Sequence, residues 1–382
     1  MNEESGTVVF DIGSLMTRVG FHFQTEPEEI ILSLVAIPRT RINVGMSDGQ
    51  KSVYFGNEAN RHRAVCKVTA PMDNGMVVDW ERLTQLIEYG YVMANVNDSS
   101  LHPVIMVDSP NTPREHRVKL AELFFERFRV PGLYFASAPV IGLFSTGHTT
   151  GMVFESGESH TLAVAVLDGI ALPHGTRKNE ICGSNVTHYL TALLSSSAQS
   201  LNSARESVRE MKEKFSFVSS DIQAESAKCK ASPSGYTQIF TLPDGQYIEL
   251  AQQCFECTEP LFAPERQYGT NHNYEGFSHT IYNALQSVSP DLHAQLRSHT
   301  VLVGGNTTIR GFAQRMQDEL DGFVVNGQKP QRKGCTRNWR GAATLGSLNS
   351  MKDLLWTKAD CEENGYEIVC ANMLMEGNMS FT

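Results

Sequence analysis

The same small hairpin is encoded twice in this sequence, and this duplication constrains the fold more than any other feature. Residues 7–23, TVVFDIGSLMTRVGFHF, read as a strand, a polar turn and a second strand, and residues 151–166, GMVFESGESHTLAVAV, repeat the plan. Apolar residues alternate on both sides of each turn, which is typical of half-buried strands. Asp11 in the first copy corresponds to Glu155 in the second. We therefore expect two related halves, each with its own sheet.

A chain of 382 residues is long enough to form two domains with separate cores. The alternating segments give way to stretches with helical periodicity, among them residues 113–128 and 204–218. Thr112 is expected to cap the first of these helices, ahead of a proline in its first turn. Ser203 and Glu206 have the spacing of a capping box at the second helix. The predicted fold class is therefore α/β with two related halves.

The second of these helices carries an apolar stripe that includes Val208 and Met211. Arg209, Lys212 and Glu213 fall outside this stripe. Helical periodicity alone therefore predicts that these three charged residues lie on the solvated surface.

The composition describes a soluble globular protein, with 41% hydrophobic and 19% charged residues. The net charge of -10 argues against broad binding to nucleic acid or to anionic membranes. No apolar run is long enough to span a bilayer, and the polar, acidic start does not resemble a signal or transit peptide. The eight cysteines are scattered, which suggests reduced thiols in the cytosol or nucleus. Cys254 and Cys257 lack a second pair at metal-binding spacing, so we do not predict a zinc site.

The turns of the two hairpins have the composition of phosphate-binding turns. A tight turn rich in Gly and Ser points several backbone N–H groups at one place, which suits phosphate oxygens. An acidic residue beside such a turn can hold a hydrated magnesium ion. A third element, residues 302–308 (LVGGNTT), places Gly304 and Gly305 at a strand end, where backbone can approach a flat ligand closely. One such turn is usually an ordinary β-turn, but the three elements together predict a nucleotide held in a cleft between two domains.

Two acidic phosphate hairpins followed by a GG turn resemble the superfamily of actin, sugar kinases and the large heat-shock chaperone ATPases. The segments between these motifs resemble actin in particular. The matches keep one register over nearly the whole chain. Because the identity is patchy, the resemblance is to a divergent actin-like or actin-related protein. The matching segments are residues 44–59, 70–81, 145–153, 168–175, 205–218, 240–246, 302–320 and 339–348.

This resemblance implies an actin-like fold, with two lobes of mixed sheet flanked by helices around a nucleotide cleft. The outer lobe would have its core in residues 1–33, 70–145 and 338–382, with a small insertion at 34–69 that carries a partner-binding loop. The inner lobe would have its core in residues 146–181 and 269–337, with an insertion at 182–268.

The resemblance also implies a site for ATP or ADP with Mg²⁺ or Ca²⁺. Asp11 and Glu155 would hold the metal ion. An alternative for Arg209, Lys212 and Glu213 is a solvated helix face without a ligand. The residues implied to bind nucleotide are Gly13, Ser14, Leu15 and Arg18 in the first hairpin, Ser156, Gly157, Glu158 and Ser159 in the second, and Gly183, Arg209, Lys212, Glu213, Gly304, Gly305, Asn306 and Ile309 around the sugar and base.

The departures from the actin pattern predict weak or absent ATP hydrolysis. Hydrolysis requires a water molecule aimed at the terminal phosphorus. Ala138 stands where actins place the glutamine that orients this water, and Leu162 stands where they place a supporting histidine; neither side chain can orient water. His160 is an alternative, because residues two apart in a strand share a face. Glu155 is one methylene longer than the family's aspartate, so a magnesium ion would shift or lose a water bridge. Together with the lost water-positioning groups, this change indicates relaxed demands on the chemistry.

Further replacements surround the implied nucleotide. Ile12 and Leu15 stand where actins have asparagine and glycine, Ile309 replaces the tyrosine beside the adenine, and Cys335 replaces the lysine on its other side. Arg18 replaces a lysine, which keeps the charge but turns a compact ammonium into a planar fork.

The implied assembly surfaces are only partly retained. Residues 39–50 keep Ile42, Val44 and Met46, which in actins dock into the next subunit, although an ordinary flexible loop is equally consistent with the pattern. Residues 263–269 (APERQYG) replace an apolar plug with charged and polar groups, which suit a dry interface poorly. Asn74 takes the place of a histidine near the phosphates. The groove that receives partner helices is better kept, with Gly147, Thr149, Leu345 and Leu348 matching.

We therefore expect an actin-like structural subunit that binds nucleotide, hydrolyses it weakly or not at all, and acts through protein partners. These partners would be other actin-like subunits or a cytoskeletal, dynactin-like, axonemal or chromatin-remodelling assembly. The expected location is the cytoplasm and cytoskeleton, with the nucleus as an alternative. A conventional filament-forming ATPase and a small-molecule kinase are the alternative functions; the kinase would need a general base facing a substrate hydroxyl, and no candidate stands outside the actin pattern.

Overall fold

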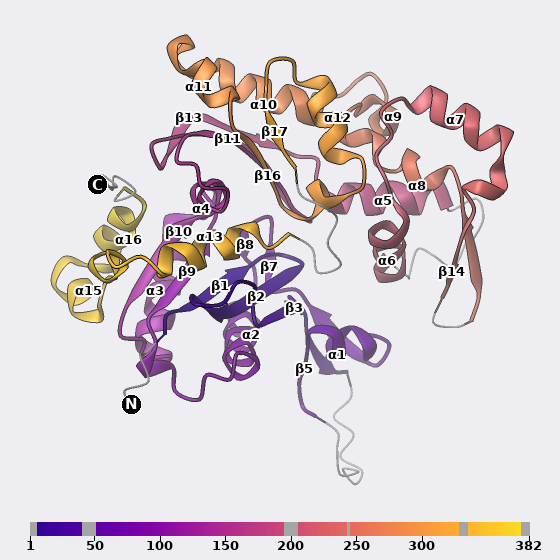
Figure 1. The fold of residues 1–382 in the computed structure, drawn as a ribbon. Coiled ribbons are helices and arrows are strands. Elements are labelled where there is room, and N and C mark those ends of the chain that lie inside the picture. The colour runs from indigo at the N-terminus through magenta and orange to yellow at the C-terminus, as the bar shows by residue number, and fades with distance from the viewer. Residues whose placement is uncertain (1–5, 40–50, 195–204, 243–244, 328–334, 376–382) are drawn as a thin grey trace, which may run out of the picture. The chain divides into compact units, whose positions relative to one another are not determined.

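The computed structural model describes residues 6–39, 51–194, 205–242, 245–327 and 335–375. The chain forms two compact units (Figure 1). Unit 1 comprises Met1–Thr149, Asp168–Ile170 and Thr336–Thr382, and unit 2 comprises Thr150–Leu167 and Ala171–Cys335. The finer division of each half into a core and an insertion stays a prediction.

The sheet of unit 1 has five strands in the order β10-β9-β1-β2-β3. Strands β1 and β2 form the first predicted hairpin, and β1 also pairs in parallel with β9, which pairs in parallel with β10. The sequence expectation for this hairpin is therefore confirmed. The strands are β1 (Val8–Ile12), β2 (Met16–Phe21), β3 (Glu29–Leu32), β9 (Val104–Asp108) and β10 (Leu133–Ser137).

The two faces of this sheet are covered by different helices. Successive side chains of β1 point alternately to one face and to the other. Val8 and Phe10 belong to a core with α2 and α3, whereas Val9 belongs to a core with α4 and α13. Trp339 of α13 is fully buried and its indole N–H donates to the Val9 carbonyl at 3.2 Å. The helices are α2 (Trp80–Met93), α3 (Arg114–Glu122), a π-helical turn η2 (Leu123–Arg127), α4 (Ala138–Phe144) and α13 (Arg337–Gly346).

Smaller elements complete unit 1. Strands β4, β5 and β6 form a separate three-stranded sheet, and β7 and β8 form a two-stranded one. These elements are β4 (Val35–Pro38), β5 (Tyr54–Phe55), α1 (Gly56–Arg61), β6 (Cys66–Thr69), β7 (Met72–Asp73), β8 (Met76–Val77), η1 (Ser99–Leu101), α14 (Met351–Leu354), α15 (Lys358–Asn364) and α16 (Tyr366–Met375).

The sheet of unit 2 repeats the topology of the first. Its order is β13-β12-β11-β16-β17, with an antiparallel hairpin β11–β12 and parallel pairs β11–β16 and β16–β17. Reversed, this order places β11 where unit 1 has β1 and β16 where unit 1 has β9. The expected duplicated α/β halves are thus confirmed. The strands are β11 (Gly151–Ser156), β12 (Thr161–Leu167), β13 (Ile170–Asn179), β16 (Thr300–Val303) and β17 (Val325–Asn326).

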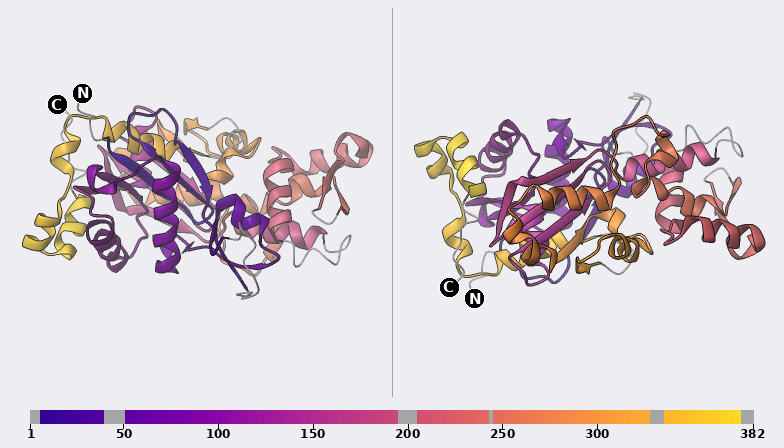
Figure 2. Two further views of the ribbon diagram at one scale, coloured as in Figure 1. Left: turned by 90° about the horizontal axis from the view of Figure 1, so that it is seen from below. Right: turned by 90° about the horizontal axis from the view of Figure 1, so that it is seen from above.

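One large core joins this sheet to the helices of unit 2. In the right-hand view of Figure 2, orange helices of this unit lie against its magenta strands. The remaining elements are α5 (Gly183–Leu194), α6 (Arg205–Phe215), α7 (Ile222–Ala231), η4 (Pro233–Gly235), β14 (Gln238–Thr241), β15 (Tyr247–Leu250), α8 (Gln253–Glu256), η5 (Glu259–Leu261), α9 (Glu265–Tyr268), α10 (Phe277–Gln286), η6 (Pro290–Leu292), α11 (His293–Arg297), η7 (Gly305–Thr308) and α12 (Phe312–Glu319).

Two details of the predicted helices need comment. The expected cap Thr112 is wrong: Pro113 occupies the N-cap position of α3, and the Thr112 side chain hydrogen-bonds with Asp108 instead. The expected cap Ser203 lies outside the described residues. All eight cysteines lie among the described residues, where they are buried and form no disulfide bond. Within the described ranges, no helix combines the length and apolar character needed to cross a bilayer.

Candidate functional site

The turn of the first hairpin is closed by backbone and by an ion pair. The Gly13 N–H donates to the Met16 carbonyl at 2.9 Å. Asp11 and Arg18 are direct cross-strand partners, and Arg18 Nη1 donates to Asp11 Oδ2 at 3.2 Å. The two side chains are only 14% and 11% exposed, respectively. The structure thus gathers Asp11, Gly13 and Arg18 at the turn end of the hairpin, with Ser14 and Leu15 between the two strands.

Ser33 anchors this turn, although sequence reasoning missed it. Its N–H donates to the Leu15 carbonyl at 2.8 Å and its hydroxyl donates to the Gly13 carbonyl at 2.7 Å. The Thr17 hydroxyl lies 2.9 Å from the Ser33 hydroxyl, in a buried position. The one sign in the sequence is a single serine within the apolar run 30–37.

The second hairpin is built in the same way, in unit 2. The Gly157 N–H donates to the His160 carbonyl at 2.9 Å, which matches the bond that closes the first turn. Glu155 is paired across the strands with Leu162, at the register position that Asp11 shares with Arg18 in unit 1. The duplicated hairpins therefore differ in the partner that they give to their acid: a guanidinium in one and an isobutyl group in the other.

The structure does not support the suggestion that His160 takes over the role of the histidine that Leu162 replaces. Strand β12 begins at Thr161, so His160 lies in the turn and not in the strand. The rule that residues two apart share a face therefore does not relate His160 to Leu162. Leu162 itself is fully buried in the sheet.

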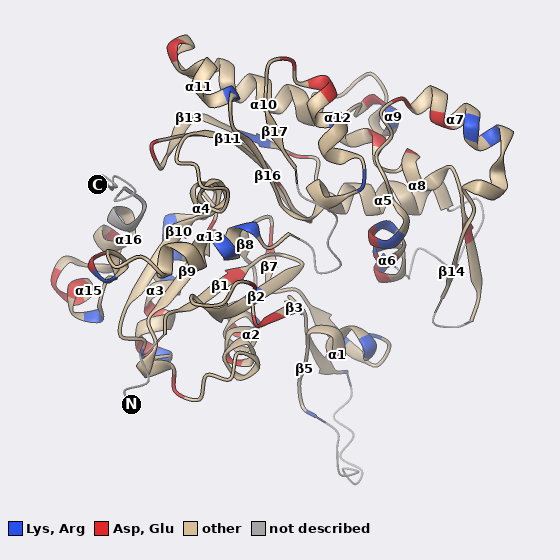
Figure 3. Ribbon diagram, in the orientation of Figure 1, with Lys and Arg blue, Asp and Glu red and all other residues tan. Residues whose placement is uncertain are grey.

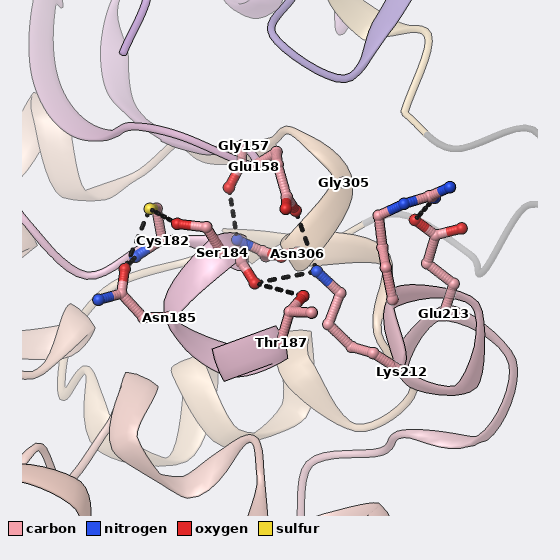
Figure 4. Close-up of polar contacts among 12 residues, drawn as sticks. Gly157, Glu158, Cys182, Ser184, Asn185, Thr187, Lys212, Glu213, Gly305 and Asn306 are labelled. Carbon is pink, nitrogen blue, oxygen red and sulfur yellow. Dashed lines mark hydrogen bonds and ion pairs between the residues drawn. The ribbon is translucent and has the colours of Figure 1, made fainter. Parts of the chain in front are cut away.

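Four segments of unit 2 meet at the second turn (Figure 4). Asn306 Nδ2 donates to the Gly157 carbonyl at 2.8 Å and to the Ser156 hydroxyl at 2.9 Å. The Gly183 N–H donates to the Gly157 carbonyl at 2.9 Å. Lys212 Nζ donates to Glu158 Oε2 at 3.0 Å and to the Gly183 carbonyl at 2.9 Å. Residues predicted from four separate stretches of sequence thus form one connected network.

Two glycines of this network have very close neighbours, which at Gly304 are backbone atoms and at Gly183 are mainly the ends of side chains. A Cβ on Gly183 would lie 2.7 Å from Glu158 Oε2 and 2.9 Å from Asn306 Oδ1. A Cβ on Gly304 would lie 2.2 Å from the Ser156 carbonyl oxygen. Gly305 is different, because a Cβ there would meet no atom within 4 Å among the described residues. The open side of Gly305 therefore suits the approach of a flat ligand, as its sequence context predicts.

Two of the charged residues predicted to lie on the surface of α6 are buried. Arg209 is 4% and Lys212 is 5% exposed, whereas Glu213 is exposed. Arg209 Nε donates to Glu206 at 2.8 Å and Nη1 to Glu213 at 2.7 Å. The surface prediction is therefore wrong for Arg209 and Lys212, because acceptors on neighbouring turns and segments compensate their burial. Figure 3 shows both signs of charge together on α6.

The burial of Lys212 leads to a stability prediction. In Lys212→Met, the Glu158 carboxylate and the Gly183 carbonyl lose their shared donor, which should lower the free energy of unfolding by about 1–3 kcal/mol. Urea unfolding followed by circular dichroism would measure the loss. Lys228→Met is a suitable control, since the Lys228 side chain is 67% exposed and its ion pair with Glu225 is on the surface. Equal stability of the two variants would contradict the structural role of Lys212.

Other predicted residues occupy less direct positions. Ile309 packs against the core of unit 2, and Cys335 is buried. Ile12 is buried in the core of unit 1. Ala138, at the start of α4, is 3% exposed and belongs to the core that contains α13. Burial within the protein is therefore sufficient to explain these side chains, and no bound ligand is needed to explain them.

The two acids predicted to hold a metal ion fit a divalent cation poorly. The Asp11 carboxylate forms an ion pair with the Arg18 guanidinium, with Oδ2 and Nη1 3.2 Å apart. The neighbours of Glu155 across the strands are Leu162 on one side and Val303 on the other, and both are buried. Magnesium keeps most of its waters, and these waters need oxygen acceptors. By contrast, the turns, the buried Lys212 and the open Gly305 are consistent with phosphate, sugar and base.

The residues predicted to line a partner groove in unit 1 differ in exposure. Gly147 and Thr149 are exposed, and Leu348 is 37% exposed. Leu345 is 4% exposed and belongs to the core beneath α13, so it does not line a surface slot. Ile42, Val44 and Met46 lie outside the described residues.

The segment 263–269 of unit 2, which replaces an apolar plug, is tied to α5. It contains the short helix α9, and the Tyr268 hydroxyl accepts a hydrogen bond from Asn185 at 2.8 Å. The Tyr189 hydroxyl donates to the Arg266 carbonyl at 3.3 Å. This segment is therefore part of the surface of unit 2 and presents the exposed Arg266 side chain.

A comparison with protein families agrees with these observations. The family model described as Actin matches residues 2–373 of the 382 in the chain. Two sheets of the same topology, each with an acidic hairpin at the same place, are also what the resemblance implied. The chain belongs to the actin family.

Proposed function

We propose that this protein is an actin-type structural subunit that binds ATP or ADP, hydrolyses ATP very slowly or not at all, and works through protein partners. In unit 1, the turn of the first hairpin would bind phosphate oxygens. In unit 2, the second turn, the network around Gly183, Lys212 and Asn306, and the open Gly305 would bind phosphate, sugar and base. The nucleotide would then stabilise the fold by binding only its native state.

One observation carries the proposal for slow hydrolysis. Ala138 and Leu162 occupy the positions where the family places its water-orienting glutamine and histidine; both are buried, and Ala138 belongs to an apolar core. A buried methyl or isobutyl group neither accepts a proton nor orients water. In-line attack on the terminal phosphate would therefore lack its positioned nucleophile.

The proposal of partner-dependent function rests on the assembly surfaces. Segment 263–269 exposes Arg266 where the family has an apolar plug, and burying an unpaired charge in a dry contact is unfavourable. Gly147, Thr149 and Leu348 remain exposed, which suits a helix docking into a groove. We propose a cytoskeletal or other multiprotein assembly in the cytoplasm. A chromatin-remodelling complex in the nucleus is the alternative that partner identification would distinguish.

Single-turnover phosphate release tests the hydrolysis proposal. With ATP bound, we expect release roughly 100-fold slower than from a conventional actin measured alongside, the size of a lost general acid–base contribution. Ala138→Gln should raise the rate, and Ala138→Leu, which adds volume without a polar group, is the matched control. Leu162→His can be added, and each variant needs a check of folding, because Ala138 and Leu162 are both buried and added volume strains a packed core. Release by the unmodified chain at the conventional rate would leave the filament-forming ATPase as the better function.

A further inference from the structure

The ion pair in the first turn has a consequence for how the nucleotide is bound. We infer that nucleotide binding by this chain does not depend on a divalent cation, because Arg18 neutralises Asp11 and serves as the counter-ion of the phosphates. This inference rests on the proposed nucleotide binding, and it departs from the metal site that the family resemblance implies. The ligand class is a metal-free nucleoside di- or triphosphate.

The geometry of the first turn supports this role for Arg18. The side chain comes from β2, directly opposite Asp11 on β1, and both are largely shielded from solvent. A guanidinium presents several N–H donors in a fixed plane, and it can hold a carboxylate and a phosphate together. Arg18 Nε is buried and has no hydrogen-bond partner among the described residues, although a buried donor normally has one. The guanidinium therefore has donor capacity beyond its bond to Asp11.

The surroundings of Glu155, the acid of the second hairpin, also fit a hydrated metal ion poorly. Glu155 lies between Leu162 and Val303 in the sheet of unit 2, and their side chains are 0% and 1% exposed. Cross-strand partners stand side by side on one face. The waters of a hydrated cation beside Glu155 would therefore meet hydrocarbon on both flanks. The first hairpin offers a cation at the same register position, so the cross-strand partners that the strand register gives the two acids are a guanidinium and two hydrocarbon side chains.

The charges in unit 1 also oppose a divalent ion. A cation bound to Asp11 would lie close to the Arg18 guanidinium, in a partly buried place where like charges repel strongly. Arginine stays protonated at every accessible pH, so the repulsion cannot be relieved by loss of a proton. A metal ion would therefore have to compete with Arg18 for the Asp11 carboxylate. The pair therefore favours the metal-free nucleotide.

Nucleotide affinity with and without metal tests the inference. The purified full chain, freed of nucleotide, would be titrated with a fluorescent ATP analogue in excess MgCl₂ and in excess EDTA. We expect the two dissociation constants to agree within about threefold. Binding that is about 100-fold weaker in EDTA would overturn the inference while leaving the proposed function intact. Absence of binding in both buffers would remove the proposed function, and the inference with it.

Two variants distinguish an Asp11 that only pairs with Arg18 from an Asp11 that holds a metal ion, because the two roles predict different changes in nucleotide affinity. Asp11→Asn removes a negative charge near the phosphates and releases Arg18, so we expect tighter binding in EDTA and no loss in MgCl₂. If Asp11 instead holds the metal ion, this variant must bind more weakly in MgCl₂. Arg18→Ala should bind weakly in EDTA and regain affinity on addition of Mg²⁺ by at least about tenfold, since the freed carboxylate can then hold the ion.

A direct measurement of metal binding provides a second readout. The electron paramagnetic resonance signal of Mn²⁺ would be followed while protein with bound ADP is added. We expect the unmodified chain to leave the signal of free Mn²⁺ unchanged, and Arg18→Ala to reduce it. Uptake of one Mn²⁺ per chain by the unmodified protein would contradict the inference. Thermal unfolding of each variant would establish that the comparison is made between folded proteins.

Discussion

Replacement of Arg117 by methionine is expected to lower the free energy of unfolding by about 3–5 kcal/mol, because it leaves a carboxylate buried without its counter-ion. Arg117 of α3 and Asp108 at the end of β9 are 8% and 5% exposed. Arg117 Nε donates to Asp108 Oδ2 at 2.7 Å, and Nη2 donates to the Ser109 carbonyl at 3.0 Å. Methionine fills a similar volume, so the loss would come from the charge and not from a cavity. Chemical denaturation would measure it.

The loss in Arg117→Met should depend on pH. Burial raises the pKa of the Asp108 carboxyl, and the Arg117 guanidinium and the Thr112 hydroxyl act against this rise. Without the guanidinium, the pKa rises further and the folded state binds a proton that the unfolded state has released. Stability then falls as pH rises above the ordinary carboxyl pKa. The deficit of the variant relative to the unmodified protein should be smaller at about pH 5 than at about pH 8.

Two comparisons separate this effect from a general loss of surface charge. Arg127 pairs with Glu88, but their side chains are 58% and 43% exposed, so Arg127→Met should change stability by less than about 1 kcal/mol. The double variant Asp108→Leu with Arg117→Met removes both charges and should recover most of the loss. The explanation would be wrong if Arg117→Met and Arg127→Met had the same stability.

Substitution of Gly304 by alanine is expected to have a similarly large effect in unit 2. Gly304 has φ 90 and ψ 162, a region that is essentially restricted to glycine. An alanine Cβ would also lie 2.2 Å from the oxygen and 2.6 Å from the carbon of the Ser156 carbonyl. Ser156 is the last residue of β11 and cannot move without disturbing the second hairpin. We expect a loss of about 3 kcal/mol and a decrease in Tm of roughly 6–12 °C.

The neighbouring glycine provides a matched control for this experiment. A Cβ on Gly305 would meet no described atom within 4 Å, and its φ lies outside the positive range. Gly305→Ala should therefore change stability by no more than about 0.5 kcal/mol. Differential scanning calorimetry of both variants would test the difference. An unchanged Tm in Gly304→Ala would show that the close approach to Ser156 is not needed for folding.

The duplicated hairpins could be predicted from the sequence because strand periodicity is local. Alternation around residues 7–23 and 151–166 predicted β1–β2 and β11–β12, and the turn residues predicted where each pair is closed. The GG element at the end of β16 was found for the same reason, since Gly304 marks a backbone that only glycine adopts. The family followed from many such matches in one register.

The burial of charged residues could not be predicted in this way. Periodicity in α6 identifies the apolar stripe with Val208 and Met211, but it does not tell which segments pack against the other faces. Arg209 and Lys212 are buried because Glu206, Glu213 and Glu158 compensate their charges. Lys212 and Glu158 are far apart in sequence, so no local pattern relates them.

The sequence by itself thus determined the two halves, the two acidic turns and the family, because local periodicity and turn chemistry specify these features. Only the tertiary structure decided what each acid faces: Arg18 beside Asp11, and Leu162 with Val303 beside Glu155. It also showed that Ser33 anchors the first turn, that His160 precedes β12, and that Leu345 is buried. The physical reason is that strand register and long-range packing set the neighbours of a side chain, and these neighbours determine its charge state and its available ligands.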